Sequence, residues 1–405
     1  MPSAEGDGME INMKIIKIGK PYIQSGDGKS KLIFDIGGGF ENNLNYNLYF
    51  EVDDQFRDYL VTEVADACVV CLLLYAMENN YDLECEAPVS ERLLYQLEEY
   101  LIPAISKNIK CYHNIRILAE ASDIEFYGNA VGTGLSCGVD SFYSVLKNLE
   151  HGNSKLQLTH LCFFNAGATG MFGGEEARTV YLERSKRFKK VSRELGCTYL
   201  ACDSNMNEFL HQEHERTHIF RTLCIPLALQ KLFSTYYFSS SYEYADFKFS
   251  DFDPAYYEIL ILPNLSNQNV RFVEVGGETT RQGKVEFISK YDITYRELNV
   301  CISGIKNCHD CRKCRRTMLN LYIAGKLDLY KKVFDVGWFK KHKHYMFRWA
   351  LMNFWRVDMP EIIKELKIRK ELTIIDYLGA ICCFPFELGR QVIGKLRFLK
   401  MKSQI

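Results

Sequence analysis

The chain has 405 residues, a formal net charge of −1 and 25% charged residues, which is the balance of an ordinary globular protein. A net charge this close to zero gives no global electrostatic reason to expect a nucleic acid or a membrane as a partner. The longest apolar run, residues 67–77, is too short to span a bilayer, and we expect neither a signal peptide nor a membrane partner. Fifteen cysteines without an export signal indicate reduced thiols, so we expect a cytoplasmic protein in which some cysteines bind metal.

Residues 1–124 are predicted to form a separate α+β domain. A long helix is expected from about residue 54 to residue 79, and a shorter one follows it. No helix start follows Gly37–Gly39, which disfavours a nucleotide loop there, and the helical surroundings of Cys68 and Cys71 disfavour a redox motif. Short strand-like runs lie at 13–18, 32–36, 47–52, 82–86 and 115–120.

From residue 130 onward, strands alternate with helices, which is typical of a parallel sheet with crossover helices. Strands are expected at 130–135, 158–164, 198–203, 235–238 and 270–275, and helices at 142–149, 175–195 and 214–233. Small or polar residues follow these strands at 136–141, 165–167, 202–205, 239–241 and 276–281. Ligands of such sheets bind beyond the carboxyl ends of the strands, so we expect a site there within an α/β domain spanning residues 125–300.

The stretch from Gly132 to Ser141 combines a short strand, a Gly/Ser loop and the start of a helix. Small side chains let phosphate oxygens approach the backbone N–H groups, and a helix N-terminus favours negative charge. The carboxylate of Asp140 among phosphate ligands indicates either a bound magnesium ion or an oriented turn. The loop lacks the Gly-Lys-Ser/Thr ending of a Walker A motif.

The six residues from Ser136 to Ser141 read Ser-Cys-Gly-Val-Asp-Ser. They resemble the Ser-Gly-Gly-x-Asp-Ser signature of the PP-loop ATP pyrophosphatases, the adenine nucleotide alpha hydrolase-like superfamily, with Cys137 in place of the first glycine. The resemblance covers about residues 128–320 and implies a parallel-sheet, HUP-like core that binds ATP and Mg²⁺. It also implies transfer of AMP to a carboxyl or carbonyl oxygen with release of pyrophosphate, after which a nitrogen or sulfur nucleophile displaces AMP.

The resemblance also implies roles for individual residues. In the loop, Asp140 would orient the turn or magnesium, and the phosphates would be held by Ser136, Gly138, Val139 and Ser141. The other expected nucleotide contacts, at neighbouring strand ends, are Phe164, Asn165, Ser239 and Ser240.

Arg281 and Lys284 lie in a basic segment similar to one in relatives, where cations neutralise developing charge. Cations near the α-phosphate are needed physically when pyrophosphate leaves. The alternative for both residues is a solvated turn.

Four cysteines form a second pattern: Cys308, Cys311 and Cys314 have two-residue gaps, and Cys301 can complete a tetrahedron. Four sulfurs suit structural Zn²⁺, with an iron–sulfur cluster or no metal as alternatives. Such a site downstream of a PP-loop core resembles the 7-cyano-7-deazaguanine synthase branch, although His309 stands where that branch usually has glycine. The neighbouring Arg312, Lys313, Arg315 and Arg316 could balance the negative charge of a Zn(Cys)₄ centre.

Other candidates are weaker. Cys137 and Cys202 are the thiols that sulfur transfer would use, although buried inert thiols are the simpler interpretation. The histidines at 211, 214 and 218 lie on one helix face, where solvated or capping roles outweigh metal binding. Residues 301–405 are predicted to form a zinc knuckle followed by helices, and the basic, aromatic segment 340–356 indicates a solvated helix face rather than a nucleic-acid site.

The sequence therefore predicts an adenylating enzyme with ATP, Mg²⁺ and structural Zn²⁺. Its substrate would be a small molecule or a carrier-protein-bound acyl group, and nitrogen transfer would follow activation. A sulfurtransferase making a thioamide or thiocarbonyl is the nearest alternative, and a non-catalytic nucleotide-binding module is the alternative of another class. We also expect a homo-oligomer.

Overall fold

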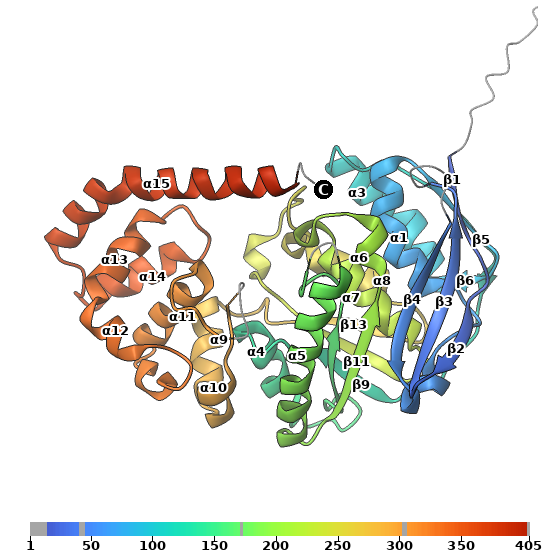
Figure 1. Ribbon diagram of the computed structural model, residues 1–405, viewed down its shortest axis with the longest axis horizontal. Coiled ribbons are helices and arrows are strands. Elements are labelled where there is room, and N and C mark those ends of the chain that lie inside the picture. The colour runs from blue at the N-terminus through green and yellow to red at the C-terminus, as the bar shows by residue number, and fades with distance from the viewer. Residues whose placement is uncertain (1–13, 40–44, 171–172, 302–305, 403–405) are drawn as a thin grey trace, which may run out of the picture. The chain divides into compact units, whose positions relative to one another are not determined.

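The computed structural model describes residues 14–39, 45–170, 173–301 and 306–402. It is a mixed α/β structure with a large, mostly parallel sheet (Figure 1). The chain divides into two compact units: unit 1 comprises Met1–Ser136 and Ser144–Glu278, and unit 2 comprises Cys137–Tyr143 and Thr279–Ile405.

One eleven-stranded sheet runs through unit 1, in the order β13-β12-β9-β10-β11-β4-β3-β1-β5-β7, with β2 paired to β3. Its first part consists of β1 (Ile15–Ile18), β2 (Tyr22–Gly26), β3 (Lys29–Gly37), β4 (Tyr46–Asp53), β5 (Asp82–Cys85) and β7 (Ile117–Leu118). Its second part consists of β9 (Ala130–Gly134), β10 (His160–Phe164), β11 (Thr198–Ser204), β12 (Phe233–Ser239) and β13 (Arg271–Val275). A separate pair is formed by β6 (Val89–Ser90) and β8 (Ala121–Ser122).

The five strands β11-β10-β9-β12-β13 are all parallel, and the first of them in sequence, β9, lies in the middle. The chain builds outward from β9 to β10 and β11 on one side and then to β12 and β13 on the other. This doubly wound order places a topological switch point at the carboxyl ends of β9 and β12, where such sheets bind ligands. The alternation of strands and helices expected from residue 130 onward is therefore confirmed.

The two parts of the sheet are continuous because β4 pairs antiparallel with β11, with Val52 opposite Cys202 and Phe50 opposite Ser204. Residues 15–118 and 130–275 thus share one sheet and one apolar core. This grouping differs from the ranges 1–124, 125–300 and 301–405 expected from the sequence.

Helices flank the sheet of unit 1, and α1 packs against α7. The long helix expected over 54–79 is two elements, because the N–H of Val61 donates to the carbonyl of Ala228 at 3.1 Å and interrupts it. The helices are η2 (Asp54–Tyr59), α1 (Asp66–Asn79), α2 (Glu91–Gln96), η3 (Leu97–Leu101), α3 (Ile102–Asn108), α5 (Gly174–Glu194), α6 (Met206–Leu210), α7 (His214–Ala228), η4 (Tyr244–Asp246), η5 (Pro254–Tyr257) and α8 (Glu258–Leu265). Helix α4 (Val139–Asn148) begins in unit 2 and ends in unit 1.

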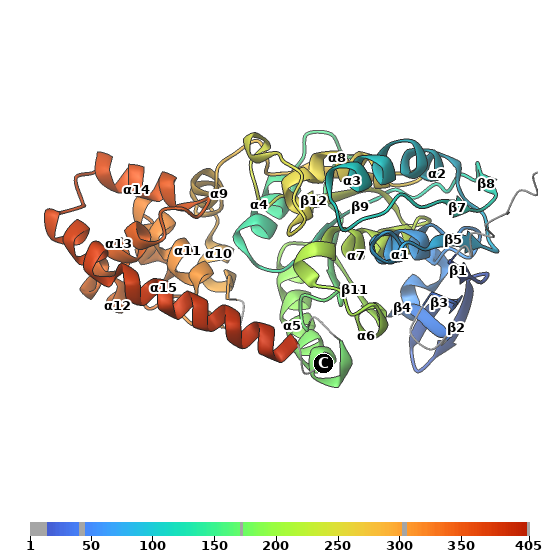
Figure 2. The ribbon, with the colours of Figure 1, turned by 90° about the horizontal axis from the view of Figure 1, so that it is seen from above.

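Unit 2 is helical after the cysteine segment, as expected (Figure 2, orange and red). Its helices are α9 (Arg281–Ile288), α10 (Asp292–Glu297), α11 (Arg312–Ile323), α12 (Val336–Lys341), α13 (Lys343–Met352), α14 (Met359–Ile368) and α15 (Ile374–Lys402). Met318, Phe339, Phe347 and Leu366 are fully buried and form its core. Among the helices of the described chain, none has a stretch long and apolar enough to cross a bilayer.

A buried polar network fixes α1 within unit 1. The carboxylate of Asp66 is fully buried and accepts hydrogen bonds from Ser90 N at 2.8 Å, Gln230 Nε2 at 3.0 Å and Asn267 Nδ2 at 2.8 Å. Burial raises the pKa of this carboxyl, and the donors act against that by stabilising its charged form. The network ties α1 to the segments that precede β12 and β13.

We expect Asp66→Asn to lower the free energy of unfolding by about 2 kcal/mol, because the new amide leaves buried donors unmatched. Urea denaturation measures the change. The control is Asp58→Asn, whose side chain is 91% exposed and which should change stability by less than about 0.5 kcal/mol. An Asp66→Asn variant as stable as this control would contradict the role of the network.

Candidate functional site

The carboxyl edge of the parallel strands in unit 1 gathers several of the residues predicted from the sequence. Ser136 follows β9 and is exposed, while Phe164 ends β10 and Ser239 ends β12 on either side of it. Cys202 lies opposite Phe164 in the β10–β11 register. Parallel pairing therefore places these residues along one edge of the sheet, as the sequence analysis expected.

Several side chains at this edge already have protein partners. Asn165 donates from Nδ2 to Asp203 Oδ1 at 2.6 Å and accepts from Thr169 Oγ1 at 2.8 Å. Ser240 donates to the carbonyl of Tyr242 at 2.8 Å and is buried. A ligand at this edge would have to compete with these partners for Asn165 and Ser240.

Phe164 is 7% exposed, and its ring stacks on Tyr236 with the ring centroids 6.0 Å apart. Cys202 is fully buried, and burial raises the pKa of its thiol well above the usual value. A thiol held in its neutral form is a poor nucleophile, so the surroundings of Cys202 favour a structural role.

The Asp140 carboxylate, in the first turn of α4, is the electrostatic centre of unit 2. It accepts from Arg281 Nη1 at 2.6 Å and forms an ion pair with Lys284 Nζ at 3.4 Å. Thr280 caps α9 by accepting from Gly283 N at 3.1 Å, and this sets Arg281 and Lys284 on one helix face. Asp140 thus contacts two of the other predicted residues, Arg281 and Lys284, which lie 141 and 144 positions later in the chain.

Burial by itself would raise the pKa of the Asp140 carboxyl, but the charges of Arg281 and Lys284 outweigh it and lower that pKa to about 2. Asp140 is therefore ionised at neutral pH. The two cations are themselves buried, with side chains 8% and 2% exposed. Since its carboxylate already has these partners, Asp140 is better placed to orient the loop than to coordinate a metal ion.

Cations outnumber carboxylates around Asp140. Arg316 contributes to its field and is itself paired with Asp358, while Lys313 lies in the field of Arg281, Arg316 and Asp140. In the described parts of the chain, neither Arg281 Nε nor Arg316 Nε has a hydrogen-bond partner although both atoms are buried. A cationic site with unused buried donors is suited to bind an anion.

Lys313 and Arg316 were assigned by sequence reasoning to the charge balance of a metal centre, not to Asp140. The three-residue spacing of Lys313 and Arg316 on α11 was the only sequence signal that the two side chains share one face of that helix. Arg315 points elsewhere: it pairs with Asp310 and lies over the rings of Tyr345 and Trp349.

Cys137 adopts a left-handed backbone conformation, with φ of 57°. Its side chain is fully buried, and its carbonyl accepts from Asn299 N at 2.8 Å. A residue with a Cβ is strained in this region, by about 1 kcal/mol, whereas glycine is not. The next loop residues lead into α4, where Val139 and Ser141 are buried and Phe142 N donates to the carbonyl of Gly138 at 2.9 Å.

The four predicted metal ligands come together in unit 2. The sulfur atoms of Cys301, Cys308, Cys311 and Cys314 all lie within 4.8 Å of one another, so the cluster could hold a metal ion such as zinc. The sulfurs of Cys308 and Cys311 accept from the backbone N–H groups three residues later, at 3.2 and 3.5 Å. These donors favour thiolates, and Cys311 also caps the N-terminus of α11, so the donor set fits Zn²⁺.

Asn307, immediately before Cys308, is held by three hydrogen bonds to the backbone. Asn307 accepts from Val300 N at 2.9 Å and donates to the carbonyls of Leu298 and Val333 at 3.0 and 3.1 Å. His309 has φ of 63°, again a conformation that favours glycine.

The three histidines do not share one helix face as expected: α7 begins at His214, and His211 lies before it with a left-handed backbone, φ of 46°. Within the described ranges they form no metal site with acidic or cysteine residues. Helix α7 does carry Arg221, which is 1% exposed and donates to Asn207 Oδ1 at 2.5 Å and to the carbonyl of Gln212 at 3.2 Å. Burial lowers the pKa of Arg221 to about 10, which leaves it charged at neutral pH.

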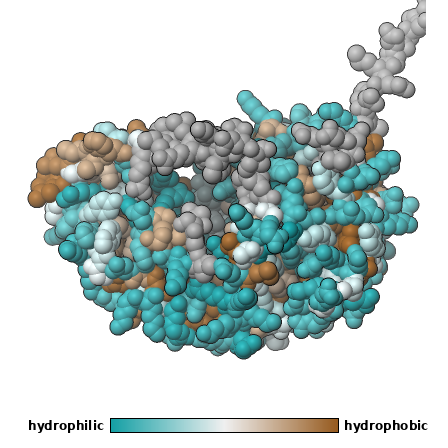
Figure 3. Space-filling view, in the orientation of Figure 1, coloured by the Kyte–Doolittle hydropathy of each residue, from teal (hydrophilic) through white to brown (hydrophobic). Residues whose placement is uncertain are grey.

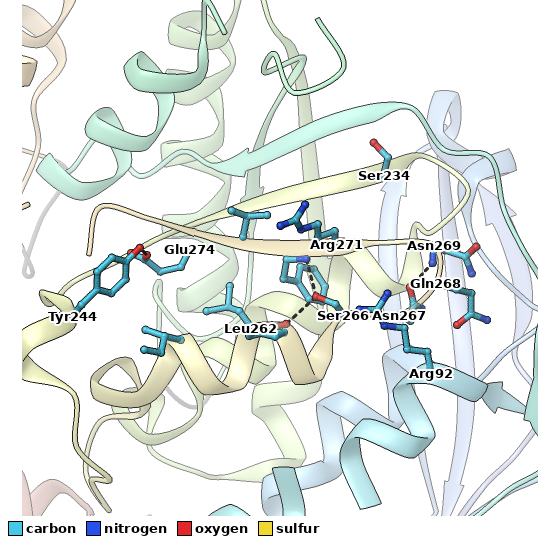
Figure 4. A pocket seen from close by; sticks show the side chains of 14 residues that line it. Arg92, Ser234, Tyr244, Leu262, Ser266, Asn267, Gln268, Asn269, Arg271 and Glu274 are labelled. Atoms are coloured by element: carbon cyan, nitrogen blue, oxygen red, sulfur yellow. Dashed lines mark hydrogen bonds between the residues drawn. The ribbon is translucent and has the colours of Figure 1, made fainter. Parts of the chain in front are cut away.

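A pocket of about 650 Å³ lies elsewhere in unit 1, along β13 and α8 (Figure 4). Arg92, Tyr244, Arg271 and Glu274 supply its polar side, and Leu262 belongs to its apolar side. None of the residues predicted to bind nucleotide or metal lines it.

Comparisons with protein-family models, with curated proteins and with solved structures find no match to this chain.

We expect the purified protein to hold about one zinc ion per chain, and Cys308→Ser to lose it, because three thiolates bind zinc far more weakly than four. Cys308 is exposed, so the substitution disturbs no packing. Elemental analysis by mass spectrometry measures the metal, with Cys197→Ser as the control outside the cluster. Iron with sulfide, or metal retained by Cys308→Ser, would contradict the assignment.

We expect Cys137→Gly to be more stable than Cys137→Ala by about 1 kcal/mol, because both remove the thiol and only glycine relieves the positive φ. Thermal unfolding of the two variants measures the difference. Equal stability would show that the backbone at residue 137 is not strained.

Proposed function

We propose that the protein binds ATP through the loop after β9 and transfers AMP to a carboxyl or carbonyl oxygen, with release of pyrophosphate. The observation that carries the proposal is the Asp140 carboxylate held by Arg281 and Lys284, with buried arginine donors left unused. The doubly wound strand order, with the loop at its switch point, supports the same conclusion.

The cations of unit 2 suit the leaving group of this reaction. As pyrophosphate departs, negative charge accumulates on its oxygens, and pre-oriented cations stabilise that charge. Arg281 and Lys284 are held in place by Asp140, and Lys313 and Arg316 add positive charge nearby. Asp140 thus positions the cations, and hydroxyl and backbone donors of Ser136, Gly138 and Ser141 would bind the phosphate oxygens.

Two departures from the resembling families add support. Cys137 and His309 stand where those families usually have glycine, and both have a positive φ of the kind that glycine adopts freely. The backbone shape that a glycine would supply is therefore present at both positions, although the side chains differ.

Nitrogen transfer is favoured over sulfur transfer because the Cys202 thiol is buried and held neutral, and because Cys137 is also buried. The substrate would be a small-molecule or carrier-bound acyl group. A non-catalytic nucleotide-binding module remains the alternative of another class, since it would need the loop but no pyrophosphate release.

The test incubates the protein with ATP, Mg²⁺, ammonium and a panel of carboxylic acids and measures pyrophosphate. We expect release that Arg281→Ala lowers by about 100-fold, because one charge-stabilising donor is lost. Asp140→Ala should lower it as well, since the cations lose their anchor.

The matched control is Asp292→Ala, an 81% exposed carboxylate of unit 2 paired only with Arg296 four residues on, and it should keep the parent rate. If the Asp140→Ala variant released pyrophosphate at the parent rate, the proposed site would be contradicted. Tight ATP binding without release for any acid would favour the non-catalytic module.

A further inference from the structure

Helix α15 presents an apolar face to solvent. Ile374 is 72% exposed, Ile381 is 70% exposed and Phe386 is 81% exposed, which is unusual for side chains of this size. Figure 3 shows hydrophobic residues gathered over the first half of this helix, at the upper left. Ile375, Leu378 and Leu388 are exposed on it as well.

The orientation of this face is fixed, because the opposite face of α15 is anchored on α13. Asp376 is fully buried, accepts from Thr373 Oγ1 at 2.7 Å, and pairs with His344 Nδ1 at 3.0 Å and Arg348 Nε at 3.5 Å. Ala380, one turn later, is also buried. This packing therefore holds the exposed residues of the first two turns, Ile374 to Ile381, outward.

Aromatic residues extend the apolar surface beyond the helix. Trp355 is 44% exposed and meets Phe384 of α15 edge-on, with the ring centroids 5.5 Å apart. Its neighbour Phe354 is 57% exposed. Tryptophan and phenylalanine are the side chains that settle at a lipid–water boundary.

The positive charge in the second half of α15 indicates which kind of partner this apolar surface would bind. Residues 390–405 contain no acidic residue. They contain five cationic residues, Arg390, Lys395, Arg397, Lys400 and Lys402. The only side-chain carboxylates in the sequence of α15 are Asp376, which is buried, and Glu387, which is partly exposed. A second copy of the helix therefore offers one partly exposed carboxylate against five cations, whereas anionic lipid headgroups can match all of them.

We propose that α15 docks unit 2 on an anionic lipid surface. The helix would lie in the plane of the interface, with Ile374, Ile381 and Phe386 toward the acyl region, and the net positive charge of the sequence after residue 389 would favour anionic headgroups. The sequence-based expectation of no membrane partner rested on the near-zero net charge and on the lack of a spanning segment. An interfacial helix of 29 residues needs no spanning segment, and a local excess of cations does not show in the net charge of the whole chain. This inference is independent of the adenylation chemistry.

The test mixes the full-length protein with vesicles of phosphatidylcholine alone, or with phosphatidylglycerol added as roughly a third of the lipid, and measures co-sedimentation. We expect binding to the anionic vesicles with a blue shift of tryptophan emission, and about tenfold weaker binding in 0.5 M salt, a roughly 4 Å screening length. The double variant Ile381→Glu, Phe386→Glu should lose the binding.

The matched control is Leu182→Glu, because Leu182 on α5 is 58% exposed and lies on another helix. It should bind vesicles as the parent does. No binding to anionic vesicles, or equal binding to neutral ones, would overturn the proposal. So would a dimer in sedimentation velocity that the double variant converts to a monomer without any lipid binding, since a second copy would then be the occupant.

Discussion

The close packing of β9 beneath two aromatic rings is the constraint on which the arrangement of unit 1 depends. A Cβ at Gly132 would lie 2.6 Å from Cε1 of Phe233 and 3.0 Å from Cδ2 of Tyr236, so only glycine fits. This allows β12 to pair with β9 and makes β9 the central strand of the parallel set. A small-residue strand in the middle of the sheet then brings the loop at Ser136 out at the switch point, between the ends of β10 and β12.

Unit 2 is organised by charge as much as by apolar packing. Its buried Arg281 and Lys284 would be expensive to desolvate alone, and the Asp140 carboxylate makes their burial tolerable. The same pairing restricts their motion, so the positive potential is already in place before any anion binds. The cysteine cluster adds a second rigid point, because its ligands flank the first turn of α11, which carries Lys313.

Much of the local structure could be predicted from sequence, and most of the long-range structure could not. The periodicity of apolar residues predicted β9 to β13 and the crossover helices. The Cys-x₂-Cys spacing predicted the four cysteines that come together as a candidate metal site. The pairing of β4 with β11 joins residues about 150 positions apart, and no local pattern records it. The sequence predicted that Arg281 and Lys284 belong to the site. Only the fold shows that both pair with Asp140. The break near Val61 was missed because a backbone hydrogen bond to Ala228 decides it, and such bonds leave no trace in residue type.

The antiparallel pairing of β4 with β11 has a consequence for how the chain could be divided. Residues 15–118 cover an edge of the parallel strands, so a fragment starting near residue 125 would leave the backbone donors and acceptors of β11 unpaired in water. Uncovered strand edges recruit other strands, and such a fragment would tend to aggregate. The N-terminal segment thus covers the edge of the parallel strands permanently and must be kept in any shortened form of the chain.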